Sequence, residues 1–278
     1  MTTNNSDTEI SFKEPKRWRV QHVAAAKAAG RKLTMLTSYD ALTAPIMEAA
    51  GVDMILVGDS YGNVQLGYDT TVKVTLDDMV RATGAVARSV HRPLVVADMP
   101  FGTYEGDKYR GFEAAAELMR AGADAVKLEG GVERADVIEQ LTTSGIPVCA
   151  HLGFTPQSVN TLGGPRMQGR GLGAEKLIAD AEAVQEAGAF ALVLEMVPDR
   201  AAARITRTLS IPTIGIGAGP NTDGQVLVWS DMAGMTEWTP SFVKRFAQLG
   251  EQLKQAAQAY TQAVKDGSFP APQHYKSE

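Results

Sequence analysis

The sequence predicts a single-domain (β/α)8 barrel, the TIM-barrel fold of the α/β class. Eight short apolar runs rich in β-branched residues alternate with longer segments of helical period. The runs are hydrophobic throughout, which is typical of parallel strands covered on both faces. A length of 278 residues is normal for one such barrel. Alternating strands and helices therefore favour the closed barrel, with an open doubly wound sheet as the structural alternative.

The predicted elements follow one another in a regular order. The strands are predicted at residues 32–37, 53–57, 94–97, 125–128, 148–150, 191–194, 213–216 and 225–228. The helices are predicted at residues 76–89, 112–121, 135–144, 174–187 and 199–209, with a final long helix at 242–263. A glycine such as Gly51 stops the helix before the second, fourth and sixth strands. A proline such as Pro93 opens the third, fifth and seventh strands, where it removes no ladder hydrogen bond.

The composition limits the classes of protein. We expect residues 1–15 to be a disordered polar extension, residues 16–266 to form the barrel and residues 267–278 to form a tail. The net charge of −5 argues against a nucleic-acid-binding surface. No apolar run approaches the ~20 residues that a transmembrane helix needs. Cys149 is the only cysteine, so an internal disulfide is impossible. A cytoplasmic protein that binds neither nucleic acid nor membrane is expected.

Two predicted connections are longer than ordinary loops between a strand and a helix. Residues 61–74 follow the second strand, and the glycine-rich residues 152–173 follow the fifth. Each is expected to be a functional loop or lid. Gly215, Gly217 and Gly219 after the seventh strand are too closely spaced for a dinucleotide-binding motif. They indicate either a close approach to an anionic ligand or a tight turn.

Ionisable residues gather where the predicted strands end. In barrels of this fold the chemistry lies at the carboxyl ends of the strands. One polar residue at such an end means little, but a set that converges on one axis indicates an active site. Five of the eight ends carry ionisable groups: Asp59, Asp98, Lys127 with Glu129, His151, and Glu195.

Asp59 and Asp98 end consecutive strands and predict a metal site. Neighbouring strands lie ~4.8 Å apart, so carboxylates at equivalent heights can reach one cation. Oxygen ligands suit Mg²⁺, which takes one or two protein carboxylates and completes its shell with water and substrate oxygens. Glu129 is a candidate for a third contact, directly or through water. The alternative is that these acids cap the helices that follow them.

Lys127 and Glu129 are two residues apart, so in a strand they face the same side. If that side is the barrel mouth, Lys127 can meet a substrate carboxylate while Glu129 stays near the metal. One alternative is a structural ion pair. Another is a Schiff-base lysine, which the surrounding acids oppose because they hold the amine protonated.

Glu195 is the candidate general base, and His151 is a candidate for orienting the substrate. Glu195 lies between an apolar strand and residues 196–198, and apolar surroundings favour proton uptake near neutral pH. Its alternative role is an ion pair with Arg200 or Arg204. His151 directly follows an apolar strand and is suited to a hydrogen bond with the substrate. The alternative is a histidine satisfied within the core.

At these residues the sequence resembles the ketopantoate hydroxymethyltransferase family. The matching segments are 57–60 (VGDS), 97–101 (ADMPF), 126–131 (VKLEGG), 151–160 (HLGFTPQSVN), 168–171 (QGRG), 194–198 (LEMVP), 214–219 (IGIGAG) and 223–225 (DGQ). The likeness covers roughly residues 32–231, and the segment HLGFTPQSVN is highly specific. Tyr61 and Asn63 stand where the family frequently has leucine and methionine, which leaves the shape of the adjacent loop open.

The resemblance implies transfer of a hydroxymethyl group from 5,10-methylenetetrahydrofolate to 3-methyl-2-oxobutanoate, with Mg²⁺ as cofactor. The product would be 2-dehydropantoate (ketopantoate), an intermediate of pantothenate biosynthesis. A homo-oligomer, commonly a decamer, is implied as well. The resemblance also implies these site residues: Asp59, Asp98 and Glu129 at the metal; Asp59, Ser60, Asp98 and Lys127 on the 2-oxo acid; and Glu195 as proton acceptor with His151 near the substrate.

Two other functions compete with this one. The first is an enolate-forming barrel lyase or mutase of the isocitrate lyase and phosphoenolpyruvate mutase type. Such enzymes typically use a catalytic cysteine in a loop, whereas Cys149 lies inside a predicted strand. The second is a non-catalytic barrel that only binds a metabolite, which would not need a base in apolar surroundings.

Overall fold

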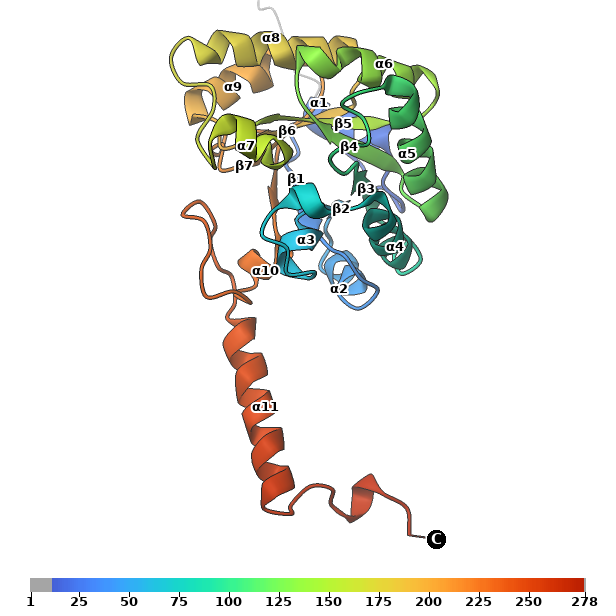
Figure 1. Cartoon of the computed structure of the whole chain (residues 1–278), viewed down its shortest axis with the longest axis vertical. Helices are drawn as coiled ribbons and strands as arrows, with labels where there is room; N and C mark the ends of the chain where they lie inside the picture. The colour runs from blue at the N-terminus through green and yellow to red at the C-terminus, as the bar shows by residue number, and fades with distance from the viewer. Residues whose placement is uncertain (1–11, 278) are drawn as a thin grey trace, which may run out of the picture. The chain divides into compact units, whose positions relative to one another are not determined.

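Eight parallel strands form a closed barrel (Figure 1). The computed structural model describes residues 12–277. Each strand pairs with the next and β8 pairs with β1, so the predicted (β/α)8 barrel is confirmed. The strands are β1 Leu33–Thr37, β2 Met54–Val57, β3 Leu94–Asp98, β4 Ala125–Glu129, β5 Val148–Gly153, β6 Ala191–Glu195, β7 Thr213–Ile216 and β8 Gly224–Leu227.

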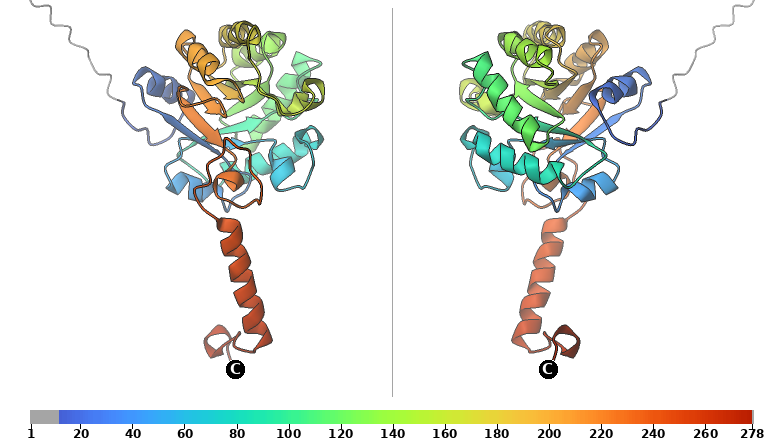
Figure 2. Two further views of the ribbon diagram at one scale, coloured as in Figure 1. Left: turned by 90° about the vertical axis from the view of Figure 1, so that its left-hand side faces the viewer. Right: turned by 90° about the vertical axis from the view of Figure 1, so that its right-hand side faces the viewer.

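Helices connect most of the strands and form the outer layer of the barrel (Figures 1 and 2). They are α1 Val20–Ala28, α2 Ala44–Ala49, α3 Tyr61–Val64, α4 Leu76–Ala87, α5 Lys108–Ala121, α6 Ala135–Thr143, α7 Val159–Leu162, α8 Gly173–Glu186 and α9 Asp199–Thr208, with 3-10 turns η1 Thr71–Lys73, η2 Val132–Arg134 and η3 Pro156–Ser158. α5 begins four residues before the predicted start at 112. The reason is the cap residue Asp107, whose carboxylate accepts the Tyr109 N–H at 2.8 Å. α1 lies beside α9 (Figure 2), where Lys27 Nζ donates to Thr206 O at 2.8 Å.

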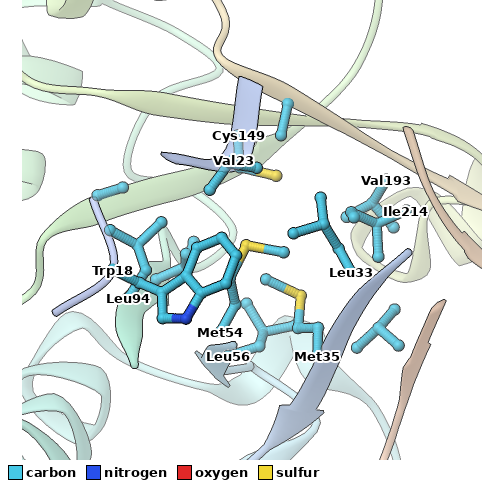
Figure 3. Close-up of a cluster of buried hydrophobic side chains, with 14 of the residues drawn as sticks. Trp18, Val23, Leu33, Met35, Met54, Leu56, Leu94, Cys149, Val193 and Ile214 are labelled. Carbon is cyan, nitrogen blue, oxygen red and sulfur yellow. The ribbon is translucent and has the colours of Figure 1, made fainter. Parts of the chain in front are cut away.

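Apolar side chains fill the interior of the barrel. Successive residues of a strand point alternately inward and outward, and inward residues such as Leu33, Met54 and Cys149 form one buried cluster (Figure 3). Trp18 and Val23, which precede β1, belong to the same cluster. The beginning of the described chain therefore closes the amino-terminal end of the barrel and leaves the opposite end for polar side chains.

A buried ion pair lies near the start of β2. Asp53 is fully buried, and its two carboxylate oxygens accept hydrogen bonds from Arg31 Nη1 and Nη2, each at 2.9 Å. Arg31 also pairs with Glu14 at 2.6 Å, and Phe12 stacks on Trp18 with ring centroids 5.7 Å apart. Part of the predicted extension thus packs on the barrel, while residues 1–11 lie outside the described residues.

The chain divides after Leu227 into two compact units. The second holds α10 Trp229–Met232, α11 Leu249–Lys265 and the 3-10 turn η4 Pro272–His274. The prediction of helix at 242–248 is wrong, because backbone groups there bond elsewhere: Phe246 N–H donates to Met232 O at 2.8 Å and Leu249 N–H to Ala233 O at 3.0 Å. The predicted limits 16–266 and 267–278 stay predictions. None of the helices in the described part of the chain is long and apolar enough to cross a membrane.

Candidate active site

The charged residues predicted from the strand ends converge at the carboxyl end of the barrel. Strand register places Asp98 opposite Lys127, Glu129 opposite His151, and Gly153 opposite Glu195. Each of these charged residues lies two positions after an inward-facing residue of the same strand. Its side chain therefore also points inward. Four of them are at most 4% exposed, namely Asp98, Lys127, Glu129 and His151.

Asp59 and Asp98 lie side by side. The Asp59 N–H donates to Asp98 Oδ2 at 2.9 Å, and both side chains are buried. Burial, followed by the charges of Asp98 and Glu129, raises the pKa of Asp59 to about 7. Burial also raises the pKa of Asp98, although Lys127 opposes that shift. The Asp59 carboxylate caps no helix, and α3 has no side-chain cap hydrogen bond, so the capping alternative is wrong for this residue.

Gly58 leaves space beside these carboxylates. A Cβ at this position would lie 2.9 Å from Ser60 Oγ and 3.5 Å from Asp98 Oδ2. Any side chain there would therefore enter the site. Ser60 Oγ, in turn, is hydrogen-bonded to Tyr39 Oη at 2.8 Å, which fixes the hydroxyl next to Asp59.

Lys127 is the buried cation of the site. Its Nζ lies 3.0 Å from Asp98 Oδ1. Burial alone would lower the pKa of Lys127, but the charges of Asp98, Glu129 and Asp59 outweigh burial and raise it. The amine is therefore protonated, which argues against the Schiff-base alternative. The ion pair with Asp98 exists, yet Lys127 and His151 together face four carboxylates, so negative charge is in excess.

The acidic pair fits a divalent cation that prefers oxygen. No group of three or more His, Cys, Asp or Glu side chains among residues 12–277 is arranged to hold a metal ion. Mg²⁺ needs only one or two protein carboxylates, since water and substrate oxygens complete its shell. Asp98 Oδ1 and Glu129 Oε1 are buried oxygens whose neighbours are ion-pair partners rather than aligned hydrogen-bond donors.

His151 bridges two carboxylates. Its Nδ1 lies 3.3 Å from Glu129 Oε1, and its Nε2 lies 3.4 Å from Glu195 Oε2. Burial and the nearby Lys127 would lower the pKa of His151, but the two glutamates outweigh them and raise it to about 9. Burial would raise the pKa of Glu129, but His151 and Lys127 lower it. His151 therefore lies between these two acids, whose charges favour its protonated form, and Lys127 Nζ also lies 3.4 Å from its Nδ1.

Glu195 is the more accessible carboxylate of the site, with 17% of its side chain exposed. It forms no ion pair with Arg204, which binds Glu175 instead. The next residue, Met196, has φ of +48°, a left-handed conformation that is uncommon outside glycine. Three hydrogen bonds hold this turn: Glu195 O accepts the Phe154 N–H at 2.8 Å, Met196 N–H donates to Ile216 O at 2.9 Å, and Met196 O accepts the Gln168 N–H at 2.9 Å. The backbone that carries Glu195 is thus fixed from three sides.

Two residues that sequence reasoning missed complete the site. Gln157 Nε2 donates to Asp59 Oδ2 at 2.9 Å, and Tyr104 Oη donates to Gln157 Oε1 at 2.6 Å. Neither residue ends a strand and neither is charged, so neither belongs to the pattern of ionisable strand ends. The one signal was the place of Gln157 in the specific segment at 151–160.

The glycines after β7 form a tight turn. Gly219 has φ of +80°, and a Cβ there would lie 2.7 Å from Asp199 Cβ. Gln225 Nε2 donates to Gly219 O at 3.0 Å. Packing and backbone conformation therefore explain why residue 219 is glycine. This agrees with the prediction of a tight turn.

The comparison with known protein families agrees with the site geometry. The family model described as ketopantoate hydroxymethyltransferase matches residues 17–272. The chain belongs to the ketopantoate hydroxymethyltransferase family. It is 55% identical over 259 residues to the 3-methyl-2-oxobutanoate hydroxymethyltransferase of Corynebacterium efficiens, covering 92% of this chain and 96% of that protein. It is 54% identical over 261 residues to the protein of the same name from Thermobifida fusca, covering 93% of each.

Solved structures with similar folds support the barrel. Phosphonopyruvate hydrolase, solved with oxalate and Mg²⁺, has a TM-score of 0.61 at 15% identity and covers 93% of this chain and 91% of its own. A 2,3-dimethylmalate lyase has a TM-score of 0.58 at 18% identity, covering 92% of each chain. Identities this low show the fold alone. Membership of the ketopantoate hydroxymethyltransferase family makes the chain a hydroxymethyltransferase enzyme.

The loop after β2, whose shape the sequence left open, is held by contacts of Tyr61 and Asn63. The ring of Tyr61 stacks on Tyr39, with centroids 5.6 Å apart. Asn63 Nδ2 donates to Tyr68 O at 2.9 Å. Because Tyr39 also bonds Ser60, the ring of Tyr61 supports the position of that serine.

Proposed function

We propose that the enzyme transfers a hydroxymethyl group from 5,10-methylenetetrahydrofolate to 3-methyl-2-oxobutanoate and releases 2-dehydropantoate. The relatives that are more than half identical carry the name 3-methyl-2-oxobutanoate hydroxymethyltransferase. The observation that carries the mechanism is the pair of buried aspartates beside an accessible glutamate in one barrel mouth. An oxygen-rich cation site and a base are the two requirements for forming an enolate from a 2-oxo acid.

Asp59 and Asp98 would hold a Mg²⁺ ion. When bound, the ion supplies Lewis acidity toward the ketone and carboxylate oxygens of the 2-oxo acid. Glu129 would approach the ion through water, because its Oε2 already accepts the Gln157 N–H at 3.0 Å and its Oε1 faces His151. The charge of the ion would offset the excess of carboxylates that Lys127 and His151 leave unbalanced.

The protein residues divide the remaining work. Lys127 offsets the charge of the substrate carboxylate, and Ser60 donates a hydrogen bond to the 2-oxo acid. Glu195 removes the proton from the carbon next to the ketone, and His151 holds the Glu195 carboxylate in place. That carbon then bonds to the folate methylene carbon as a C–N bond breaks. A water molecule supplies the hydroxyl group as the second C–N bond breaks. The two nitrogens that are released each gain a hydrogen, one from Glu195 and one from that water molecule.

A cavity next to Glu129 supports the binding of a second substrate. A cavity of about 360 Å³ is bordered by Glu129, Gly153 and Thr155, and by Leu177 of α8. Gln168 of the 152–173 loop also borders this cavity. Its backbone attachment to Met196 links the loop to the turn that carries Glu195. This arrangement supports closure of the loop over the bound substrates to exclude water.

An assay with both substrates tests the proposal. The expected result is product formation only when 3-methyl-2-oxobutanoate and methylenetetrahydrofolate are both present, with loss of turnover in EDTA and recovery on adding Mg²⁺. Full turnover in EDTA would rule out the metal. Cleavage of a 2,3-substituted acid without folate would instead favour the lyase alternative, which the burial of Cys149 inside the barrel disfavours.

A further inference from the structure

Gln157 is the centre of a buried hydrogen-bond network beneath the acids. Its side chain is 5% exposed. Nε2 donates to Asp59 Oδ2 at 2.9 Å and to Met99 O at 3.0 Å, while Oε1 accepts from Tyr104 Oη at 2.6 Å. Both amide hydrogens and the amide oxygen thus have partners. A flipped amide would turn its oxygen toward two other oxygens, so only one orientation is stable.

The same two residues also hold Glu129. The Gln157 N–H donates to Glu129 Oε2 at 3.0 Å, and the Glu129 N–H donates to Tyr104 Oη at 3.1 Å. Tyr104 is 1% exposed, and burial, with the charge of Glu129, raises the pKa of its phenol well above the ordinary value. The hydroxyl therefore keeps its proton and donates a hydrogen bond to Gln157 Oε1.

We propose that Gln157 and Tyr104 are positioning residues that orient Asp59 and Glu129 for the metal. This inference rests on the proposed metal site. One oxygen of Asp59 is held by Gln157, which leaves Oδ1 for the cation. A carboxylate whose orientation is fixed before the ion arrives loses less side-chain freedom on binding, and residues behind metal ligands typically contribute 10–100-fold to metal affinity.

The network also connects the acids to the 152–173 loop. Gln157 lies in η3, at the beginning of that loop, and contacts both acids through its side chain and its backbone. An ion bound to Asp59 would therefore stabilise the first turn of the loop as well, because the Gln157 side chain joins that turn to Asp59. We expect metal binding to slow proteolysis of the exposed glycine-rich part of the loop, where trypsin can cleave after Arg166 and Arg170.

Binding of Mn²⁺, measured by electron paramagnetic resonance on the whole enzyme, tests the proposal without an activity readout. Gln157→Leu should weaken Mn²⁺ binding about 10–100-fold. Tyr104→Phe, which removes a single oxygen, should weaken it by a smaller factor and serves as the test if the leucine variant does not fold. Gln140→Leu changes the same residue type on α6, outside the site, and should bind Mn²⁺ like the parent enzyme.

The outcomes separate this inference from the proposed function. Mn²⁺ should slow cleavage after Arg166 and Arg170 in the parent, and this protection should be lost in Gln157→Leu when both proteins are compared well below the melting temperature of the variant. Parent-like Mn²⁺ affinity in both Gln157→Leu and Tyr104→Phe would overturn the positioning role while leaving the metal site in place. A parent enzyme that binds no Mn²⁺, with or without the 2-oxo acid, would remove the metal site itself.

Discussion

Replacing Glu195 by glutamine should nearly abolish proton removal from the 2-oxo acid. The amide has almost the same shape as the carboxylate and can occupy the same place beside His151, whose Nε2 lies 3.4 Å from Glu195 Oε2 in the parent. The expected loss of rate therefore comes from the missing base and not from a change in the shape of the site. A positioned general base contributes about 10²–10⁴-fold, which corresponds to roughly 3–5 kcal/mol of activation free energy.

The assay is exchange of the C–H next to the ketone for deuterium, followed by proton NMR in D₂O with Mg²⁺ and without folate. Binding of the 2-oxo acid, measured separately by calorimetry, should remain detectable because Lys127 and the aspartates are untouched. The pKa of His151 should also fall below the parent value of about 9, since one of the two carboxylates that raise it is gone. Exchange within about threefold of the parent rate would refute the assignment of Glu195 as base, because the minimum expected for a general base is about 10².

Three further predictions follow from buried groups. Lys127→Met should raise KM for the 2-oxo acid at least about tenfold, since truncating one partner of a buried charge pair costs roughly 2 kcal/mol or more; an unchanged KM would contradict its role. Cys149 should resist iodoacetamide at pH 8 until the protein unfolds. The thiolate is the reactive form, and burial raises the pKa of this thiol to about 12. Rapid labelling of the native enzyme would contradict this prediction. Arg31→Leu should lower the free energy of unfolding, measured in urea, by about 3 kcal/mol, because it leaves the buried Asp53 carboxylate without its cation. Arg17→Leu removes a half-exposed arginine from its pair with Asp124 and should cost under about 1 kcal/mol. Equal losses in the two variants would argue against a special role for burial.

The strands and the charged part of the site could be read from the sequence because they follow simple periods. A strand covered on both faces is apolar along its length, and all eight strands lie within three residues of their predicted ends. Residues two apart share a face, which is why Lys127 and Glu129 were expected together and lie together.

The remainder depends on contacts that no local pattern encodes. The start of α11 is set by hydrogen bonds from 246–250 to the carbonyls of 232–234, which compete with helix formation. Gln157 and Tyr104 are neutral residues in different loops, 53 positions apart, and they meet only in the folded barrel. Their role becomes visible only from their distances to Asp59 and Glu129.

The most direct test of the metal site is a crystal structure of the enzyme grown with Mn²⁺ and 3-methyl-2-oxobutanoate, with the ion located by its anomalous scattering. We expect one ion about 2.1 Å from an oxygen of Asp59 and from an oxygen of Asp98, with the ketone and carboxylate oxygens of the ligand completing its shell. An ion bound elsewhere, or a ligand seated in the barrel mouth with no ion between these aspartates, would contradict it.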